Sequence, residues 1–201
     1  MLSKPIEEVT FAFLDIETTG LSAEKGARVC EVAVVKNMGG KSGESFSRLV
    51  NPLCPIPPQV SMIHKITDDM VAGEPHFEKV APVLASVLED CAVVCHNADF
   101  DVKFLSYEFQ RIGLRFPDVP VLDTLKFARR HGGFESNRLG NIAQALGYGT
   151  EGWHRALADV KMTEYVFLHF VNRFRELGAR TLSDLSRLQT VSSAAFKNQH
   201  S

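Results

Sequence analysis

The chain has 201 residues, of which 45% are hydrophobic, and a formal net charge of −2. That length suits one domain with a sizeable core. The near-neutral charge excludes a protein that coats long nucleic acid through its phosphates. It leaves open an enzyme that grips a few terminal nucleotides, because bound divalent cations would bring positive charge to the site.

Cysteine usage and hydropathy indicate the compartment. The four cysteines are scattered and none forms a C-x2-C zinc pair, so buried free thiols in a reducing compartment are expected. Residues 1–9 contain no basic segment followed by an apolar run, so we expect no secretory signal. No apolar stretch approaches the ~18 residues of a membrane span. These features predict a cytoplasmic protein with no membrane contact.

The first part of the chain predicts three strands. Val9–Leu14 is a short apolar run that ends at Asp15, and Val29–Val35 and Glu44–Val50 indicate the second and third strands. The glycines at 39, 40 and 43 suit a hairpin turn between the second and the third. Residues 51–58 contain four prolines and are expected to form an extended loop.

Helices and two further strands follow. The expected elements, in chain order, are a helix at Phe77–Leu88, a strand at Ala92–Cys95, a helix at Phe100–Ile112, a strand at Val121–Leu122, and helices at Leu125–Arg130, Leu139–Leu146, Ala156–Leu177 and Thr181–Leu188. Pro82 is an interior misfit that would kink its helix or move the helix start. The last dozen residues are small and polar, and we expect them to fray.

This order predicts an α/β fold with one mixed five-stranded sheet flanked by helices. The first three strands are joined by short links and should be antiparallel neighbours, whereas the later strands return through helical crossovers and should run parallel to the first. Residues 1–180 are expected to form the functional domain, and residues 181–201 a short C-terminal helix and a frayed tail.

The segment after the first apolar run places two carboxylates side by side. Residues two apart in a strand share a face, so Phe11, Phe13, Asp15 and Glu17 should line one face of the first strand. Neighbouring carboxylates repel each other inside a core, but at a strand end facing a crevice they suit a hard cation. Gly20 then lets the chain turn away. The alternative is a solvated acidic strand end.

Two further aspartates lie at the start of a helix. Asn97 can cap this helix, and the helix dipole stabilises negative charge in its first turn. That explanation suits Asp99. Asp101 lies deeper, beside the bulky Phe100, and is the better candidate to point into a crevice.

A histidine and an aspartate five residues apart form the third group. On one continuous helix His154 and Asp159 would point about 140° apart. They converge only if His154 precedes the helix, which Gly152 and Trp153 favour by indicating a loop before it. We expect Trp153 to hold His154 in place by packing.

Together these groups supply four carboxylates, one imidazole and no thiolate. This is the ligand inventory for two-metal phosphodiester hydrolysis, in which cations about 3.5–4 Å apart clamp the attacking and leaving oxygens. An imidazole whose pKa lies near neutrality can take the proton from the attacking water.

Three segments resemble, in order and in separation, the motifs of the DEDDh 3′→5′ exonuclease family: Asp15-x-Glu17-Thr18-Thr19-Gly20-Leu21, Asn97-Ala98-x-Phe100-Asp101 and His154-x4-Asp159. The resemblance spans about residues 9–170 and is greatest to the proofreading (epsilon) subunit of bacterial DNA polymerase III and its stand-alone relatives. The histidine in the last motif disfavours the oligoribonuclease and family-A polymerase proofreading types, which have tyrosine there.

The resemblance implies an RNase H-like fold and stepwise release of nucleoside 5′-monophosphates from the 3′ end of single-stranded DNA. It implies that Asp15, Glu17 and Asp159 hold one Mg²⁺ or Mn²⁺ ion, that Asp15 bridges to a second ion, and that Asp101 completes the acidic set. His154 would be the general base.

The resemblance also implies contacts to the terminal nucleotide, which would come from Thr18, Thr19, Gly20, Leu21, Asn97 and Phe100, with Leu21 as a wedge beside the last base. Residues 63–67 are similar to the family's His-Gly-Ile-Thr stretch near the substrate. Here Lys65 replaces the glycine, which either alters the turn or adds a phosphate contact. His64 is either a substrate contact or a surface loop histidine.

Two other functions stay open. An RNA substrate, as in ribonuclease T-like relatives, fits the same motifs because nothing in them reads a 2′-hydroxyl. A subunit that mainly docks on a DNA polymerase fits the amphipathic C-terminal half, although every catalytic position is present and Gln189–Phe196 does not resemble a clamp-binding sequence.

Outside the motifs, Asp123 either lines the crevice or caps the next helix. Arg129, Arg130 and Arg138 either contact phosphates or solvate a helix end.

Overall fold

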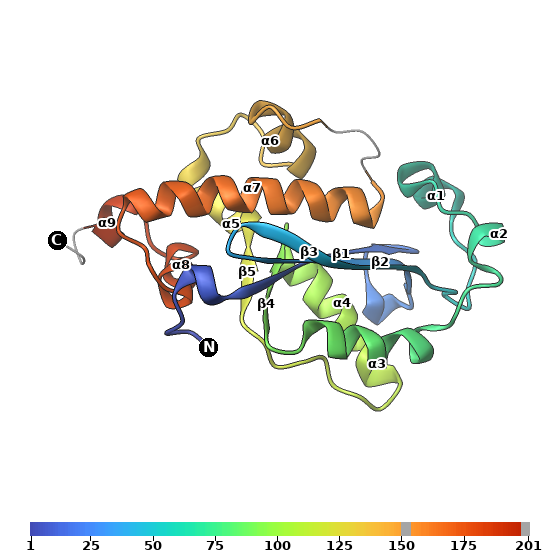
Figure 1. The fold of residues 1–201 in the computed structure, drawn as a ribbon. Coiled ribbons are helices and arrows are strands. Elements are labelled where there is room, and N and C mark those ends of the chain that lie inside the picture. The colour runs from blue at the N-terminus through green and yellow to red at the C-terminus, as the bar shows by residue number, and fades with distance from the viewer. Residues whose placement is uncertain (150–153, 198–201) are drawn as a thin grey trace.

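The computed structural model describes residues 1–149 and 154–197 (Figure 1). Gly152, Trp153 and the tail from residue 198 lie outside the described residues, and so does the expected packing of Trp153. One sheet, in the strand order β3-β2-β1-β4-β5, lies between two helical layers. The helices of these layers are α7 (Ala156–Glu176) with α6 (Leu139–Ala145) outside it on one face, and α3 (Phe77–Leu88) and α4 (Ala98–Arg111) on the other.

The sheet has the predicted mixed topology. Its strands are β1 (Thr10–Thr18), β2 (Val29–Met38), β3 (Lys41–Leu49), β4 (Cys91–Cys95) and β5 (Val121–Asp123). β1 pairs antiparallel with β2 and β2 with β3, while β4 is parallel to both β1 and β5. The carboxyl ends of β1, β4 and β5 therefore meet at one edge of the sheet, where ligands bind in open α/β sheets.

β1 is longer than its apolar run predicted. It continues past Leu14 to Thr18 because β2 pairs with it over its whole length, as far as Thr18 opposite Val29. Asp15 and Glu17 therefore lie within the strand, as the face expected for them required.

The two faces of β1 belong to two different cores. Phe11 and Phe13 pack against Phe167 of α7, with ring centroids 4.8 and 5.4 Å apart. Leu14 and Ile16 point to the other face, into the core beneath α3 and α4. This alternation places Asp15 and Glu17 on the face that α7 covers.

The remaining helices show where sequence patterns were insufficient. They are α1 (Pro58–His64), α2 (Asp68–Val71), α5 (Thr124–Phe127), α8 (Leu182–Leu188), α9 (Ser193–Lys197), the 3₁₀ turns η1 (Ile6–Glu8) and η2 (Ala23–Lys25), and the π-helical turn η3 (Ala128–Gly132). The proline-rich loop ends in α1, since proline fits the first position of a helix. The helix expected at Leu125–Arg130 is divided into α5 and η3.

Helix capping also differs from expectation. Asn97 precedes α4 with φ 75° and makes no side-chain cap. Asp123 instead accepts hydrogen bonds from the backbone amides of Leu125 (2.8 Å) and Asn97 (3.0 Å). Of the two roles open for Asp123, the structure shows the capping one.

The C-terminal segment forms two short helices within the part that the structure describes. Thr181 caps α8 in a capping box, and Phe196 of α9 is completely buried. The segment also pairs with the N-terminus, because Ile6 N donates to Arg180 O (2.9 Å) and Leu182 N donates to Lys4 O (3.1 Å). Among the described residues, no helix is long and apolar enough to cross a membrane.

Candidate active site

Three carboxylates converge between β1 and α7. Asp15 and Glu17 project from β1 toward α7, and Asp159 lies in the first turn of that helix. One carboxylate oxygen from each lies within 4.8 Å of the others. Oxygen donors at such spacing suit a hard divalent cation.

Asp101 reaches the same place from α4. Its side chain is buried, and its carboxylate accepts a hydrogen bond from the backbone amide of Ile16 in β1. It also lies close enough to Asp15 for its charge to raise the pKa of Asp15. The structure therefore brings together all four carboxylates that the sequence singled out.

The four carboxyl groups resist ionisation together. Burial is the largest cause for each, and it raises the pKa of Asp15 and Asp101 well above the ordinary value. The pKa of Glu17 rises to about 8 and that of Asp159 to about 7, with nearby carboxylates adding to burial. Such a cluster requires a compensating positive charge to ionise fully. The all-oxygen donor set and this charge deficit fit divalent cations.

These pKa shifts predict how metal-free stability depends on pH. Glu17 and Asp159 hold protons up to about pH 8 and 7 when folded, against 4.5 and 3.8 when unfolded. The folded state then binds more protons between about pH 4 and 8, so these groups lower the free energy of unfolding as pH rises. In EDTA, we expect the Asp159→Asn variant to have a higher Tm than the unsubstituted protein. The difference between the two Tm values should increase from pH 5 to pH 8.

Excess Mg²⁺ at pH 8 provides the control for that series. The ion binds only the folded, ionised cluster, so it should raise the Tm of the unsubstituted protein more than that of Asp159→Asn. A Tm gap that is constant with pH, together with no effect of Mg²⁺, would show that the cluster holds no cation.

His154 lies before α7, next to its N-cap Arg155, as the spacing from Asp159 required. It has φ 67°, and its backbone amide donates to the Asp159 carboxylate (3.3 Å). Burial lowers the pKa of the imidazole, with a smaller effect from the charge of Lys65. The ring is therefore neutral at neutral pH and can accept a proton.

A fifth carboxylate, Glu31, was missed by the sequence analysis. It lies opposite Glu17 in the β1–β2 pairing and is only 3% exposed. Arg155 pairs with it through two hydrogen bonds, of 2.7 Å from Nη2 and 3.2 Å from Nε, and the Ala156 amide donates to it at 2.9 Å. Glu31 thus anchors the start of α7, directly after His154. One signal was present, because Glu31 is the single charged residue in the apolar run Val29–Val35.

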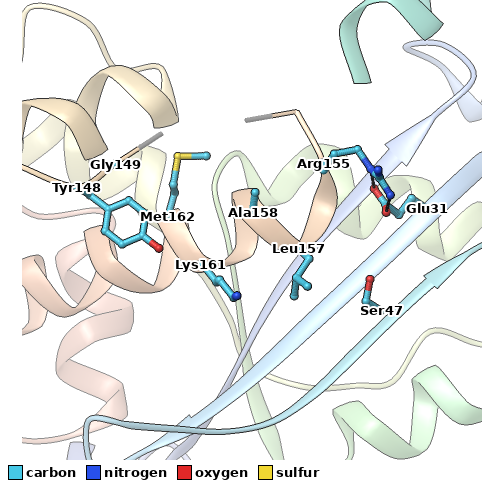
Figure 2. A pocket seen from close by; sticks show the side chains of 9 residues that line it. All are labelled: Glu31, Ser47, Tyr148, Gly149, Arg155, Leu157, Ala158, Lys161 and Met162. Atoms are coloured by element: carbon cyan, nitrogen blue, oxygen red, sulfur yellow. Dashed lines mark hydrogen bonds and ion pairs between the residues drawn. The ribbon is translucent and has the colours of Figure 1, made fainter. Parts of the chain in front are cut away.

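Figure 2 shows this ion pair at one end of a pocket of about 610 Å³ between α7 and strands β2 and β3. None of the predicted catalytic residues lines this pocket. The Glu31 carboxylate in it is already bonded to Arg155, so we assign the pair to holding the start of α7.

Removing the arginine of this pair is expected to destabilise the protein. In Arg155→Met the buried Glu31 carboxylate loses its partner, which should lower the free energy of unfolding by about 1–3 kcal/mol. Solvent screens part of the interaction, since the Arg155 side chain is 40% exposed. Urea unfolding measures the loss. The double variant with Glu31→Gln should recover part of it, whereas strictly additive losses would show that the two residues do not interact.

The residues expected to hold the terminal nucleotide separate into two groups. Thr18 and Thr19 are buried and support the turn itself: Thr18 Oγ1 donates to Gly20 O (2.7 Å), and Thr19 Oγ1 accepts from Arg28 N (3.0 Å). Leu21 is 90% exposed beyond this turn.

Asn97 and Phe100 belong with Leu21 as accessible side chains. Asn97 is exposed, and Phe100 is half-buried with its ring packed on Phe104 at 5.1 Å. An accessible leucine and an accessible aromatic ring are suited to contact a base.

His64 is not a surface histidine. It is 1% exposed, its Nδ1 accepts from Ile66 N (3.0 Å), and its ring also hydrogen-bonds the backbone of Thr18. It therefore lies behind the turn at Thr18 and supports it. Lys65 keeps the local turn by adopting φ 63°, a left-handed conformation in which glycine is unstrained.

One cleft of about 530 Å³ is lined by three of the five candidate catalytic residues. These three are Asp15, His154 and Asp159. The other lining residues are His96, Asn97, Leu125, Arg129, Asn137, Arg138 and Leu139. Two of the arginines left open by the sequence, Arg129 and Arg138, therefore lie in the same cleft as the carboxylates.

The chain belongs to the exonuclease family, since the family model RNase_T, described as exonuclease, matches residues 12–167. This confirms the resemblance that the three motifs indicated. Among curated relatives, the 3′-5′ exonuclease DinG of Bacillus subtilis (strain 168) is 35% identical over 179 residues, covering 89% of this chain and 19% of that protein. The PolC-type DNA polymerase III of Thermotoga maritima is 34% identical over 195 residues, covering 96% and 14%. The chain thus spans less than a fifth of either relative.

Solved structures agree with the fold. Exonuclease X in complex with 5′ overhanging duplex DNA superposes with a TM-score of 0.70 and 29% identity, covering 89% of this chain and 99% of that one. The E. coli ExoI–ssDNA complex superposes with a TM-score of 0.74 at 22% identity, covering 85% and 43%, and supports the fold alone.

Proposed function

We propose that this chain is a metal-dependent 3′→5′ exonuclease that hydrolyses the terminal phosphodiester bond of single-stranded DNA and releases nucleoside 5′-monophosphates. The observation that carries this proposal is the convergence of Asp15, Glu17, Asp101 and Asp159 beside the neutral imidazole of His154. The relative named as a 3′-5′ exonuclease, and the exonuclease structure that contains DNA, support the direction and the polymer.

Mg²⁺ or Mn²⁺, two ions per site, are the cofactors we propose. The donors are all carboxylate oxygens, which these hard ions prefer. Asp15, Glu17 and Asp159 would hold one ion, Asp15 would also reach the second, and Asp101 would complete the acidic set. When bound, such ions activate a water and stabilise charge on the attacking and leaving oxygens.

The protein side chains supply positioning and proton transfer. The neutral imidazole of His154 would take the proton of the attacking water, and Asp159 keeps that residue in place through its backbone amide. The exposed Leu21 would wedge beside the last base, and Asn97 and Phe100 would contact the same nucleotide. Thr18, Thr19 and Gly20 would shape the turn that carries Leu21, and His64 would support that turn from behind.

A 5′-labelled single-stranded DNA oligomer tests the proposal. With Mg²⁺, we expect a ladder of products that shorten by one nucleotide at a time, and EDTA should abolish it. Intact DNA in Mg²⁺, or degradation that EDTA does not affect, would refute a metal-dependent exonuclease. Immediate release of a labelled mononucleotide would refute the 3′→5′ direction.

An RNA substrate is the second candidate, and the name of the matched family model favours it. Matched DNA and RNA oligomers of one sequence decide between the two. We expect the larger kcat/KM on DNA, and a larger value on RNA would overturn the assignment.

Association with a DNA polymerase is a further proposal, motivated by similarity to polymerase proteins. Besides the PolC-type relative, the DNA polymerase III subunit epsilon-like protein of Rhodobacter capsulatus is 36% identical over 182 residues, covering 88% of this chain and 26% of that protein. Co-purification with a polymerase, and activity that depends on it, would support docking. The cytoplasmic location stays a prediction.

A further inference from the structure

Two arginines in the catalytic cleft have no counter-charge among the described residues. Arg129 and Arg138 are both exposed and line the cleft that contains Asp15, His154 and Asp159. Within residues 1–149 and 154–197, neither guanidinium makes a hydrogen bond or ion pair, and neither pairs with the carboxylates of the cleft. A guanidinium is always charged and offers a planar fork of donors, which suits a phosphate.

The backbone that carries Arg129 is firmly held. Arg129 lies in the π-helical turn η3, a rare form that is frequently found at functional sites. The neighbouring His131 donates from Nε2 to Leu188 O (2.7 Å), and its Nδ1 lies 2.8 Å from Ser193 Oγ. Arg130 Nε donates to Gln189 O (3.2 Å). The C-terminal helices therefore fix the turn that presents Arg129 to the cleft.

The loop that carries Arg138 is held by a hydrogen bond from His96. His96, at the end of β4, donates from Nε2 to Asn137 O (2.9 Å), and its Nδ1 lies 2.9 Å from Thr124 Oγ1. Burial lowers the pKa of His96, so the ring is neutral and adds no charge to the cleft. Arg138 directly follows the anchored Asn137 and precedes α6.

We propose that Arg129 and Arg138 bind a backbone phosphate of the substrate strand on the 5′ side of the scissile bond. The inference rests on the proposed function. A strand that ends in a 3′-hydroxyl has no phosphate beyond the scissile one, so any other phosphate lies toward its 5′ end. Arg129 follows β5, and β4 lies between β5 and β1 in the sheet. Arg129 is therefore away from the turn after β1, at Thr18–Leu21, where the last nucleotide would bind.

A second cleft adjoins the catalytic cleft at Arg129. Its volume is about 680 Å³, and it shares Arg129 with the catalytic cleft while Lys126 and Arg130 also line it. Asp99 and Asp123 line it as well, and Lys126 pairs with Asp99 (3.1 Å), so the second cleft has mixed charge. A strand that passes from the carboxylates across Arg129 would enter this cleft beside the guanidinium groups.

Two substrates separate this contact from the chemical step. One is a single-stranded DNA oligomer. The other is the p-nitrophenyl ester of thymidine 5′-monophosphate, which contains the scissile diester and no phosphate on its 5′ side. The variants are Arg129→Gln, Arg138→Gln and the double. Arg115→Gln is the matched control, since Arg115 is an exposed arginine in the loop after α4.

The expected effect is on binding of the polymer. Each variant should raise KM for the oligomer about tenfold, the usual scale of a charge-assisted hydrogen bond. The ratio of kcat/KM on the oligomer to that on the ester should fall accordingly. The slope of log KM against log salt should decrease by about 0.7 for each phosphate that the variant no longer neutralises. Arg115→Gln should match the unsubstituted protein in all three measurements.

Two results would overturn the assignment. The first is a constant ratio of the two kcat/KM values, with hydrolysis of the ester reduced as much as that of the oligomer. The arginines would then act on the scissile phosphate. If KM and the salt slope are unchanged, they contact no phosphate. Hydrolysis of neither substrate by the unsubstituted protein would refute the exonuclease proposal. The arginine pair would still be tested, because fluorescence anisotropy of a labelled oligomer should show the same tenfold weakening of Kd without turnover.

Discussion

Asp15→Asn is expected to lower the rate of DNA hydrolysis by several orders of magnitude while the fold stays intact. Asp15 lies close to the other acidic groups, since the charges of Asp101 and Asp159 both raise its pKa. It is the carboxylate that both proposed ions would share, so its loss should affect both. Asparagine has the same shape and removes repulsion among buried carboxyl groups, so Tm in EDTA should be unchanged or higher.

Single-turnover rates on single-stranded DNA with Mg²⁺, and thermal unfolding in EDTA, measure these two effects. Asp69→Asn is the matched control, because Asp69 is an exposed aspartate in the first turn of α2. It should retain the full rate. A full rate in Asp15→Asn would show that the shared-ion arrangement is wrong.

His154→Ala should reduce kcat by about 10²–10⁴-fold, the usual contribution of a positioned general base. The reason lies in its environment, because burial and the charge of Lys65 keep the imidazole neutral at neutral pH. Protonation would remove the base, so kcat should decline as pH falls through a pKa below the ordinary histidine value of 6.5. The pH profile of kcat is the measurement, and the variant should lack this acid limb.

His76→Ala is the control for this substitution. His76 is an exposed histidine that precedes α3 and makes no side-chain cap. Its variant should keep both the rate and the acid limb. If His154→Ala kept them too, another group would have to take the proton from the attacking water.

Much of the fold could be predicted from the sequence, because the apolar runs and the lengths of the links between them indicate the same topology. Apolar runs with short links predicted the antiparallel strands, and helical crossovers predicted the parallel ones. α3 begins and ends at the predicted residues, Phe77 and Leu88, and Pro82 lies inside it. The π-helical turn η3 was not predicted, because an apolar period near 3.6 does not distinguish α from π backbone.

The site was predictable where it depends on short spacings. The period of two in a strand placed Asp15 and Glu17 on one face, and the spacing of His154 and Asp159 required a helix start between them. Glu31 was missed because its burial depends on Arg155, which is 124 residues away in sequence. The anchoring of Arg129 depends in the same way on helices near the C-terminus.

α7 also acts as a spacer between the cleft and the chain termini. Its 21 residues span roughly 30 Å, with His154 before its first residue. At its far end the N-terminal and C-terminal segments pair with each other (Figure 1). A polypeptide fused to either segment would therefore be tethered well away from the cleft that Asp15, His154 and Asp159 line. This geometry is compatible with the same fold forming part of longer proteins, such as the relatives of which the chain spans less than a fifth.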